Sequence, residues 1–369
     1  MKNTFGSHLT LTLFGESHGP AVGAVLDGLA PGIPVDEEAI ARLLERRRPR
    51  GAGETARRER DDFRIESGVF RGRTTGTPLC ILIPNNDTHS TDYIYGPVRP
   101  SHADYAASEK YHGFEDYRGG GHFSGRLTAA LVAAGGILLP ALAKKGIRIG
   151  AHILACAGVY DRGFSPLAPE GEIDALSDCG TGMPVLDAAR GAEMEEKILA
   201  AAADGDSVGG IVECAVTGLS AGLGEPWFES VEGQLSLALF GVGGIKGVAF
   251  GAGFALCECR GSAANDPFRM GRDGRVCTTK NDSGGINGGL TNGMPVLFSC
   301  AVRPTPSVAK TQKTVDITTR TDTDFSVRGR HDPAIVRRVC PVVESVTALV
   351  MADLLAGRFG GDWLGEGVR

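Results

Sequence analysis

Two stretches of the chain occur twice, in the same order, and this repetition constrains the fold more than any other feature of the sequence. DGLAPGIPVDEEAIARLLERRRP, which begins at Asp27, has a counterpart in TGLSAGLGEPWFESVEGQLSLALFGV, which begins at Thr217. Both place a G-L-x-x-G-(I/L) turn and a Pro-acidic pair before an amphipathic helix. GGHFSGRLT at 120–128 likewise matches GGINGGLT at 284–291. Similar segments in a fixed order indicate a duplicated structural unit.

No stretch has the composition of a linker, so the two copies are expected to share one core. We predict a single domain over residues 1–369 with an internal pseudo-two-fold repeat, whose halves cover roughly 1–190 and 191–369. Chance similarity between glycine-rich turns is the alternative, because the chain holds 54 glycines, about twice the average usage.

Helical and strand-like patterns alternate irregularly along the chain. Helices are predicted where apolar periodicity meets start and stop signals, such as Asp36 as an N-cap: 35–49, 102–113, 126–146, 193–205 and 332–357. Short apolar runs predict strands at 8–14, 78–84, 149–160, 209–216, 253–259 and 294–302. Because regular β-α-β alternation is absent, we predict an α+β fold with largely antiparallel sheets and long buried helices.

One helix segment, 127–143, is apolar enough to raise the question of a membrane span. It is at the short limit for a span and contains Gly135, Gly136 and Pro140, so we expect a buried core helix instead. The N-terminal MKNTFGSHLTL lacks the apolar region of a secretory signal. These features favour a protein without a membrane partner.

Charge and cysteine usage narrow the class of protein. The net charge of −6 argues against a general nucleic-acid binder. Nine cysteines, without a C-x-x-C pair, indicate buried free thiols in a reducing, cytoplasmic compartment. The nearest two, Cys257 and Cys259, would share one face of a strand. No H-E-x-x-H, C-x-x-C or D-x-D-x-D-G pattern predicts a metal site.

The segment GESHG at 15–19 fits the G-x-S-x-G pattern of a hydrolase nucleophile elbow, with Ser17 as nucleophile. An elbow needs a helix directly after the serine. Here Pro20 and AVGAVLDG follow, and that run predicts a strand. The hydrolase interpretation is therefore the weaker one, although Glu, Ser and His between glycines still need a role.

Basic and glycine-rich segments predict an anion site. RRRPRGAGETARRER at 46–60 holds seven arginines, which suits a small polyanionic ligand better than nucleic acid. DYRGGGHFSGRLTA at 116–129 is a glycine-rich loop opening a helix, where backbone amides bind phosphate. His102 stands at a predicted helix start, as a tuned proton donor or a capping residue. In GRHDP, Asp332 is a natural N-cap, whereas Arg330 and His331 are unexplained.

Several motifs together resemble the chorismate synthase family, in order and over almost the whole chain. They are FGESHG (14–19), RRRP (46–49), RPSHADY (99–105), DYRGGGHFSGR (116–126), GLGEPWFE (222–229), NGG (287–289), RPTPS (303–307) and GRHDP (329–333). The resemblance implies a β-α-β sandwich with long central helices between antiparallel sheets. It also implies anti-1,4-elimination of phosphate from 5-enolpyruvylshikimate 3-phosphate to give chorismate, with reduced FMN and no net redox change.

The resemblance also implies site residues. The catalytic ones are His18, His102, Asp332 and Ser17, with His18 protonating the departing phosphate and His102 acting on the reduced flavin. Substrate would be bound by Arg47, Arg126, Arg330 and Arg50, where Arg57 is the alternative to Arg50, and Arg47 also matches a contact of an NADP-type phosphate. FMN would be bound by His122, Phe123, Ser124, Gly243, Gly244, Gly288, Arg303, Pro304, Thr305, Pro306, Ser307 and Arg330.

Members of the family are usually homotetramers, and the absence of an added domain favours reduced flavin from an external flavin reductase, with NADPH as an indirect source. The sequence departs from the family pattern at His122, which stands for an arginine, at Gly243 and Gly244, and at Arg303, which stands for a lysine. These departures bear on FMN affinity. A non-catalytic anion- or flavin-binding protein and a flavin reductase remain alternatives.

Overall fold

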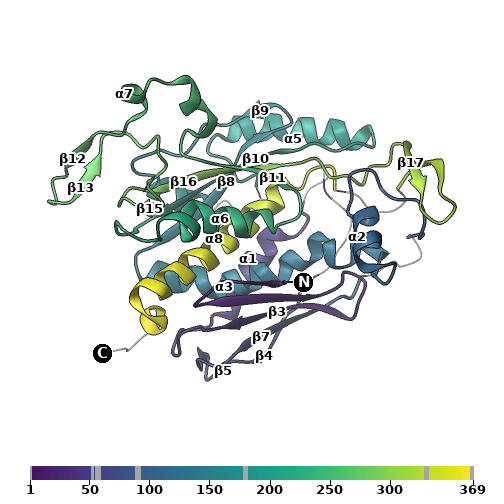
Figure 1. Ribbon diagram of the computed structural model, residues 1–369, viewed down its shortest axis with the longest axis horizontal. Coiled ribbons are helices and arrows are strands. Elements are labelled where there is room, and N and C mark those ends of the chain that lie inside the picture. The colour runs from purple at the N-terminus through teal and green to yellow at the C-terminus, as the bar shows by residue number, and fades with distance from the viewer. Residues whose placement is uncertain are drawn as a thin grey trace.

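Two antiparallel sheets enclose the long helices of the chain in the computed structural model, which describes residues 2–50, 54, 60–87, 93–177, 182–327 and 332–365 (Figure 1). The first sheet has the order β1-β2-β3-β7-β4. Its strands are β1 (Thr4–Phe5), β2 (Thr10–Gly15), β3 (Ala21–Asp27), β4 (Arg64–Ser67) and β7 (Leu79–Pro84). The second has the order β11-β16-β10-β8-β9. Its strands are β8 (Arg148–Cys156), β9 (Val159–Tyr160), β10 (Gly210–Thr217), β11 (Ile245–Phe250) and β16 (Val296–Val302).

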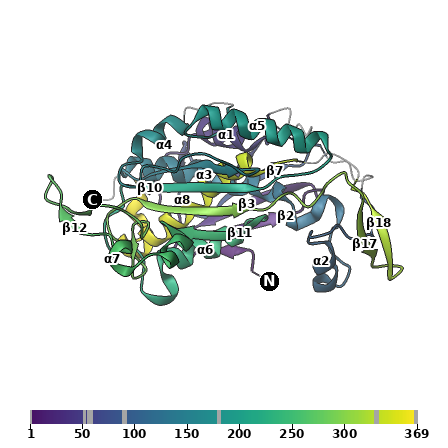
Figure 2. The ribbon, with the colours of Figure 1, turned by 90° about the horizontal axis from the view of Figure 1, so that it is seen from above.

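Helices α1 (Glu37–Arg47), α3 (Thr128–Lys144) and α8 (Val336–Phe359) lie between the sheets, and the turned view in Figure 2 shows α4 (Glu170–Ser177) and α5 (Ala188–Ala203) along one side. The other helices are α2 (Asp104–Tyr111), α6 (Val231–Phe240) and α7 (Gly261–Ala264). Short 3-10 turns are η2 (Arg118–Phe123), η3 (Gly125–Leu127), η4 (Trp227–Glu229), η5 (Gly253–Glu258) and η6 (Gly361–Leu364). Two-stranded ribbons pair β5 (Val69–Phe70) with β6 (Arg73–Thr74), β12 (Phe268–Met270) with β13 (Val276–Thr278), β14 (Ile286–Asn287) with β15 (Leu290–Thr291), and β17 (Gln312–Asp316) with β18 (Thr321–Phe325).

The two sheets repeat one strand order. The first contains β2-β3-β7-β4 and the second contains β8-β10-β16-β11, so the strands correspond in chain order as well as in space. The helix α1 follows β3 as α6 follows β10, and the long helices α3 and α8 come after β7 and β16. The segments that begin at Asp27 and Thr217 therefore lie at equivalent places in the two sheets.

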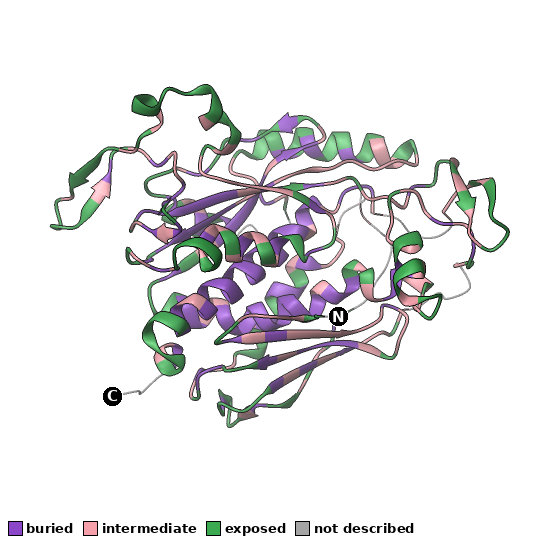
Figure 3. Ribbon diagram, viewed as in Figure 1, coloured by how far each residue is buried: buried purple, intermediate pink, exposed green. Residues whose placement is uncertain are grey.

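The glycine pair in α3 explains how closely the central helices pack. A Cβ atom on Gly135 would lie 2.2 Å from Oγ of Ser345 in α8, and one on Gly136 would lie 2.7 Å from Cα of Ile40 in α1. Only hydrogen fits at either position. The predicted core helix at 127–143 is confirmed, since most of its residues are buried (Figure 3).

Within the described part of the chain, two helical segments are long and apolar enough to cross a membrane, 125–144 and 336–359. Most of each apolar window, 72% and 94%, is buried inside the molecule. Their apolar surfaces are therefore used in packing α3 and α8 between the two sheets. Asp36 caps α1 as expected, because its Oδ1 accepts from the backbone N–H groups of Glu38 (2.9 Å) and Ala39 (3.1 Å).

The strand predicted at 253–259 is wrong. Gly251 and Gly253 have φ angles of 55° and 53°, which turn the chain directly after β11 into the 3-10 helix η5. A side chain on Gly251 would lie 2.0 Å from the carbonyl oxygen of Asp282, so the turn requires glycine. Cys257 and Cys259 are consequently exposed, unlike the buried thiols expected from the sequence.

Candidate active site

A cavity of about 570 Å³ opens where the end of α1, the glycine-rich segment, the turn after α6 and the start of α8 meet. It gathers residues from both halves of the chain, and most of the sequence-predicted site residues line it. These are Arg47, His102, Phe123, Ser124, Arg126, Gly243, Gly244, Arg303, Pro304, Thr305, Pro306, Ser307 and Asp332. The matched strand orders of the two sheets bring these distant segments to one place.

Positive charge dominates the cavity wall. Among the described residues that line it are six cationic side chains and one carboxylate, that of Asp332. The cations are Arg47, Arg99, Arg126, Lys246, Arg303 and Arg338. Such an excess attracts a ligand that carries several negative charges, because phosphates and carboxylates form charge-assisted hydrogen bonds with guanidinium groups.

Asp61 holds two of these arginines from behind. Nη2 of Arg47 donates to Oδ2 of Asp61 at 2.7 Å, and Nη1 of Arg126 donates to Oδ1. Burial alone would raise the pKa of Asp61, but the two guanidiniums outweigh it and hold that pKa below its ordinary value. Burial lowers the pKa of Arg47, and Asp61 partly offsets this effect. Nε of Arg47 is buried and has no hydrogen-bond partner among the described residues, which leaves one donor for a ligand.

Asp332 and Arg338 form an ion pair in the cavity wall, and Nε of Arg338 donates to the carbonyl of Arg47 at 2.9 Å. The predicted N-cap role of Asp332 is wrong. The helix α8 begins only at Val336, with Ile335 at the N-cap position, so the Asp332 side chain pairs with Arg338 instead of capping. Sequence reasoning missed Asp61 and Arg338, although both stand close to motifs that it singled out.

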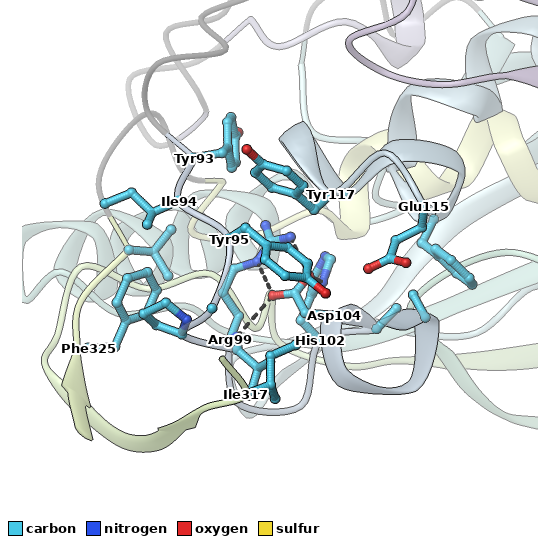
Figure 4. Close-up of a pocket in the computed structure, with 18 of the residues that line it drawn as sticks. Tyr93, Ile94, Tyr95, Arg99, His102, Asp104, Glu115, Tyr117, Ile317 and Phe325 are labelled. Carbon is cyan, nitrogen blue, oxygen red and sulfur yellow. Dashed lines mark hydrogen bonds and ion pairs between the residues drawn. The ribbon is translucent and has the colours of Figure 1, made fainter. Parts of the chain in front are cut away.

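His102 belongs to a charged cluster with Arg99 and Asp104, drawn in Figure 4. Nδ1 of His102 donates to Oδ1 of Asp104 at 2.6 Å, and Arg99 donates to both oxygens from Nε (2.8 Å) and Nη2 (2.7 Å). Burial alone would raise the pKa of Asp104, but these hydrogen bonds outweigh it and hold that pKa well below its ordinary value. The helix α2 begins at Asp104 with Ala103 as N-cap, so His102 precedes it and does not cap it.

A smaller pocket of about 50 Å³ adjoins the cavity and shares Arg99 and His102 with it. Tyr93, Tyr95 and Tyr117 stand around it in Figure 4. These tyrosines form an aromatic wall beside the His102 cluster, and one of them, Tyr93, also lines the cationic cavity.

The glycine-rich segment and the GESHG loop form one unit. Gly119, Gly120 and Gly121 have φ angles of 60°, 88° and 53°, which only glycine adopts readily. A Cβ atom on Gly119 would lie 2.4 Å from Nε2 of His18 and 2.7 Å from Oγ of Ser17. Gly119 lines the cavity, so His18 and Ser17 lie directly behind this part of its wall.

Hydrogen bonds join the same two segments. The backbone N–H of Ser17 donates to the carbonyl of Gly121 at 3.1 Å, and its Oγ donates to the carbonyl of Arg118 at 3.2 Å. His122 donates from Nδ1 to the carbonyl of Gly15 at 2.8 Å. Ser17 is fully buried, and its turn leads into the antiparallel strand β3 and not into a helix. The geometry of a nucleophile elbow is therefore absent here.

Five predicted residues that the structure describes do not line the cavity: His18, Ser17 and His122, which were placed above, and Gly288 and Arg50. Gly288 lies in the turn between β14 and β15. The next residue, Gly289, accepts a hydrogen bond at 3.0 Å from the backbone N–H of Val231, the first residue of α6, so this turn lies at the start of that helix. Gly243, which does line the cavity, lies beyond the last residue of α6, so the length of that helix, about 15 Å, separates it from the β14–β15 turn. Arg50 donates from Nε to the carbonyl of Glu45 at 2.9 Å and does not line the cavity. Arg330, like the alternative Arg57, lies outside the described residues.

Comparisons with known proteins agree with this architecture. The family model for chorismate synthase matches residues 9–356. The chorismate synthase of Thermococcus kodakarensis is 45% identical over 355 residues, covering 96% of this chain and 97% of that protein. The enzyme of Pyrococcus abyssi is 46% identical with the same coverage. A crystal structure titled as chorismate synthase superposes with a TM-score of 0.77 at 27% identity, covering 97% of this chain and 94% of that one.

The two-sheet fold with central helices and the cationic cavity define an α+β protein with a site whose charge suits a polyanionic small molecule. Within that class, the chain belongs to the chorismate synthase family. It is thus a carbon–oxygen lyase acting on phosphates, in a family that works in the shikimate pathway of aromatic amino-acid synthesis and uses reduced FMN.

Proposed function

We propose that this chain converts 5-enolpyruvylshikimate 3-phosphate to chorismate by anti-1,4-elimination of phosphate, with reduced FMN bound in the same cavity. The observation that carries the proposal is the charge of the cavity wall, where six cations face one carboxylate. The substrate brings one phosphate and two carboxylates, and the flavin brings a further phosphate. A cavity of about 570 Å³ with this charge suits several anionic groups at once.

Arg47 and Arg126 are proposed to bind the anionic groups of the substrate. Both line the cavity from buried positions, and the unpartnered Nε of Arg47 supplies a donor that folding alone leaves unused. A ligand oxygen there would satisfy a buried group whose isolation costs free energy. Arg50 and Arg330 remain proposals from the family resemblance, as does the contact of Arg47 with an NADP-type phosphate.

His18 is proposed to donate the proton that the departing phosphate takes up. It lies behind Gly119, with its ring edge against Tyr93 at a centroid distance of 5.1 Å. His102 is proposed to hold a proton at Nδ1 against Asp104, so that Nε2 is the atom that can exchange a proton with a bound molecule. Ser17 and Asp332 are proposed to relay protons. Asp332 suits this role because, among the described residues that line the cavity, it carries the carboxylate.

The residues around the 303–307 segment fit a flavin. Oγ1 of Thr305 is buried and meets no hydrogen-bond partner in the described ranges, and Thr305 lines the cavity. Ser124, Gly243 and Gly244 also line it, and the two glycines have no side chain that would keep a ligand from their backbone. We propose that these residues, with Phe123, Arg303, Pro304, Pro306 and Ser307, hold FMN. When bound in its reduced form, FMN supplies the electron-rich ring that the elimination requires.

His122 and Gly288 are proposed as further flavin contacts on the family resemblance alone. His122 commits Nδ1 to Gly15, so its Nε2 is the ring atom available to a ligand. Reduced FMN is proposed to come from an external flavin reductase in the cytoplasm, with NADPH as the indirect source of electrons.

A homotetramer is proposed as the working assembly. Large apolar side chains are exposed on η4, α6 and η5, beside the edge strand β11. Trp227, Phe228 and Phe254 are 86%, 90% and 85% exposed, which is costly unless a second copy covers them. Light scattering after size-exclusion chromatography would test this, with a lower mass expected for Phe228→Ser.

A single domain with a pseudo-two-fold repeat is proposed for residues 1–369. The support is the shared order of β2-β3-β7-β4 and β8-β10-β16-β11, with α3 and α8 packed on each other in one hydrophobic core. Halves expressed separately would then expose one face of α3 or α8 and should aggregate.

An anaerobic assay tests the proposed reaction. The protein is mixed with 5-enolpyruvylshikimate 3-phosphate and chemically reduced FMN, and phosphate release and chorismate absorbance are followed together. Equal amounts of both products, absent with oxidised FMN, would support the proposal. Flavin binding without product would favour the binding-only alternative, and substrate-independent NADPH consumption would favour a flavin reductase.

A further inference from the structure

We propose that Asp61 is a positioning residue, which fixes the orientation of Arg47 and Arg126 for the elimination at the expense of anion affinity. The inference rests on the proposed function, because both arginines are proposed substrate contacts. Asp61 precedes β4, and its side chain is 1% exposed. It is separated by 14 residues from Arg47 and by 65 from Arg126, so only the fold brings the three together.

The geometry assigns one carboxylate oxygen to each arginine. Oδ2 of Asp61 accepts from Nη2 of Arg47 at 2.7 Å, and Oδ1 accepts from Nη1 of Arg126. A third cation, Arg48, approaches Oδ2 from outside with its Nε at 3.9 Å. One carboxylate thus holds two guanidiniums side by side, although their like charges repel each other.

The two arginines differ in what remains for a ligand. Arg126 is further fixed by Nε to Oδ1 of Asn85 at 2.9 Å and by Nη2 to the carbonyl of Pro84 at 3.0 Å. Within the part of the chain that the structure describes, Arg47 has beyond Asp61 only a long side-chain contact from Nη1 to Oγ1 of Thr128 at 3.4 Å, and its buried Nε has no partner. Asp61 is therefore the contact that chiefly determines where the open donor of Arg47 points.

Two opposite effects follow from the buried charge. The negative charge of Asp61 lowers the positive potential of the cavity, so it weakens the binding of any anion. The same charge keeps both guanidiniums in one orientation, and orientation counts more in the transition state than in ground-state binding. Neutralising Asp61 should therefore tighten substrate binding and slow turnover, whereas a residue with a purely structural role would not produce this combination.

The test compares Asp61→Asn with Asp62→Asn, which removes the same charge from the neighbouring exposed residue. Asp61→Asn is expected to lower kcat about 100-fold and to lower KM about 3- to 10-fold. Asp62→Asn should change neither by more than about twofold. Asp61→Glu keeps the charge but shifts the arginines by one methylene, so kcat should fall while KM stays near that of the wild type.

Folding and function are separated by two further measurements. Circular dichroism and thermal unfolding show whether Asp61→Asn is folded. If Asp61→Asn does not fold, the kinetics of Asp61→Glu, which keeps the negative charge, decide the role of Asp61. Calorimetry with inorganic phosphate reports anion affinity without turnover. Tighter phosphate binding by Asp61→Asn than by Asp62→Asn is expected, and equal or weaker binding overturns the inference. If the wild type forms no chorismate, the proposed function fails, and the phosphate comparison still decides the role of Asp61 toward anions.

A raised KM with unchanged kcat in Asp61→Asn would also overturn the inference, because it would mean that Asp61 contributes to anion binding and not to orientation. In Asp61→Glu, wild-type kcat would overturn it as well, since displaced arginines should not support full turnover.

Discussion

Nδ1 of His102 lies 2.6 Å from Oδ1 of Asp104, and the same carboxylate is bound by both Nε and Nη2 of Arg99. The arginine holds Asp104 ionised and in place, so the carboxylate accepts the Nδ1–H of the imidazole. Nε2 then faces Gly120, where a Cβ atom would lie 3.4 Å away. The cluster therefore fixes which nitrogen of His102 is presented to a bound molecule.

Asp104→Asn should lower kcat by about 10²- to 10⁴-fold with little change in KM. Oδ2 of Asp104 accepts from both the backbone N–H and Nε of Arg99, so the amide oxygen of the asparagine should take that place. Its NH₂ group would then face Nδ1 of His102. The imidazole would then carry its proton on the wrong nitrogen. Steady-state kinetics measure the effect, and Glu109→Gln on the exposed face of α2 is the matched control. Wild-type kcat in Asp104→Asn would show that this tautomer is not needed.

The same carboxylate predicts a pH dependence of stability. Since the folded protein holds the pKa of Asp104 below its ordinary value, the ionised form stabilises the native state. That contribution is complete above the unfolded pKa of about 4 and is lost as the pH falls toward the depressed native value. The stability difference between wild type and Asp104→Asn should thus be largest above pH ~5 and should shrink below pH ~4. Urea unfolding across this range would measure it; a constant difference would contradict the prediction.

Much of the architecture was predictable because its signals are local. The apolar stretch 127–143 and the capping residue Asp36 are read from neighbouring residues, and both predictions are confirmed. The repeated segments indicated where α1 and α6 lie. By contrast, the apolar run 253–259 looks like a strand but has no sheet neighbour to pair with, since glycines turn it away after β11.

Contacts between residues far apart in the chain could not be predicted from the sequence. Asp61 meets Arg126 across 65 residues, and nothing in the local sequence distinguishes it from the exposed Asp62 beside it. Asp332 has the local pattern of an N-cap, but the ion pair with Arg338 in the folded chain takes its side chain elsewhere. Motif resemblance located most of the cavity wall because it reports on the whole family, whereas periodicity reports only on nearby residues.

Gly119→Ala should abolish most activity while leaving the fold intact. The new methyl group would lie 2.4 Å from Nε2 of His18 and 2.7 Å from Oγ of Ser17, and the φ angle of 60° is strained for alanine. His18 would be pushed away from the cavity wall, so kcat should fall by about 10²-fold or more. Gly171→Ala in α4 is the control, because no atom lies within 4 Å of its added Cβ. Normal kcat in Gly119→Ala, with an unchanged melting temperature, would argue against His18 as the acid.

Gly135→Ala should affect stability and not chemistry. Its added Cβ would lie 2.2 Å from Oγ and 2.5 Å from Cβ of Ser345, at the contact between α3 and α8. Overpacking of this kind costs about 1–3 kcal/mol, although alanine recovers part of this through its higher helix propensity. The free energy of unfolding, measured by urea titration, should therefore fall by about 1–2 kcal/mol, with kcat unchanged at temperatures where the variant stays folded. Ser345→Ala removes the nearest atom and should restore part of the loss in the double variant; equal stability of Gly135→Ala and the wild type would mean that the two helices can separate without cost.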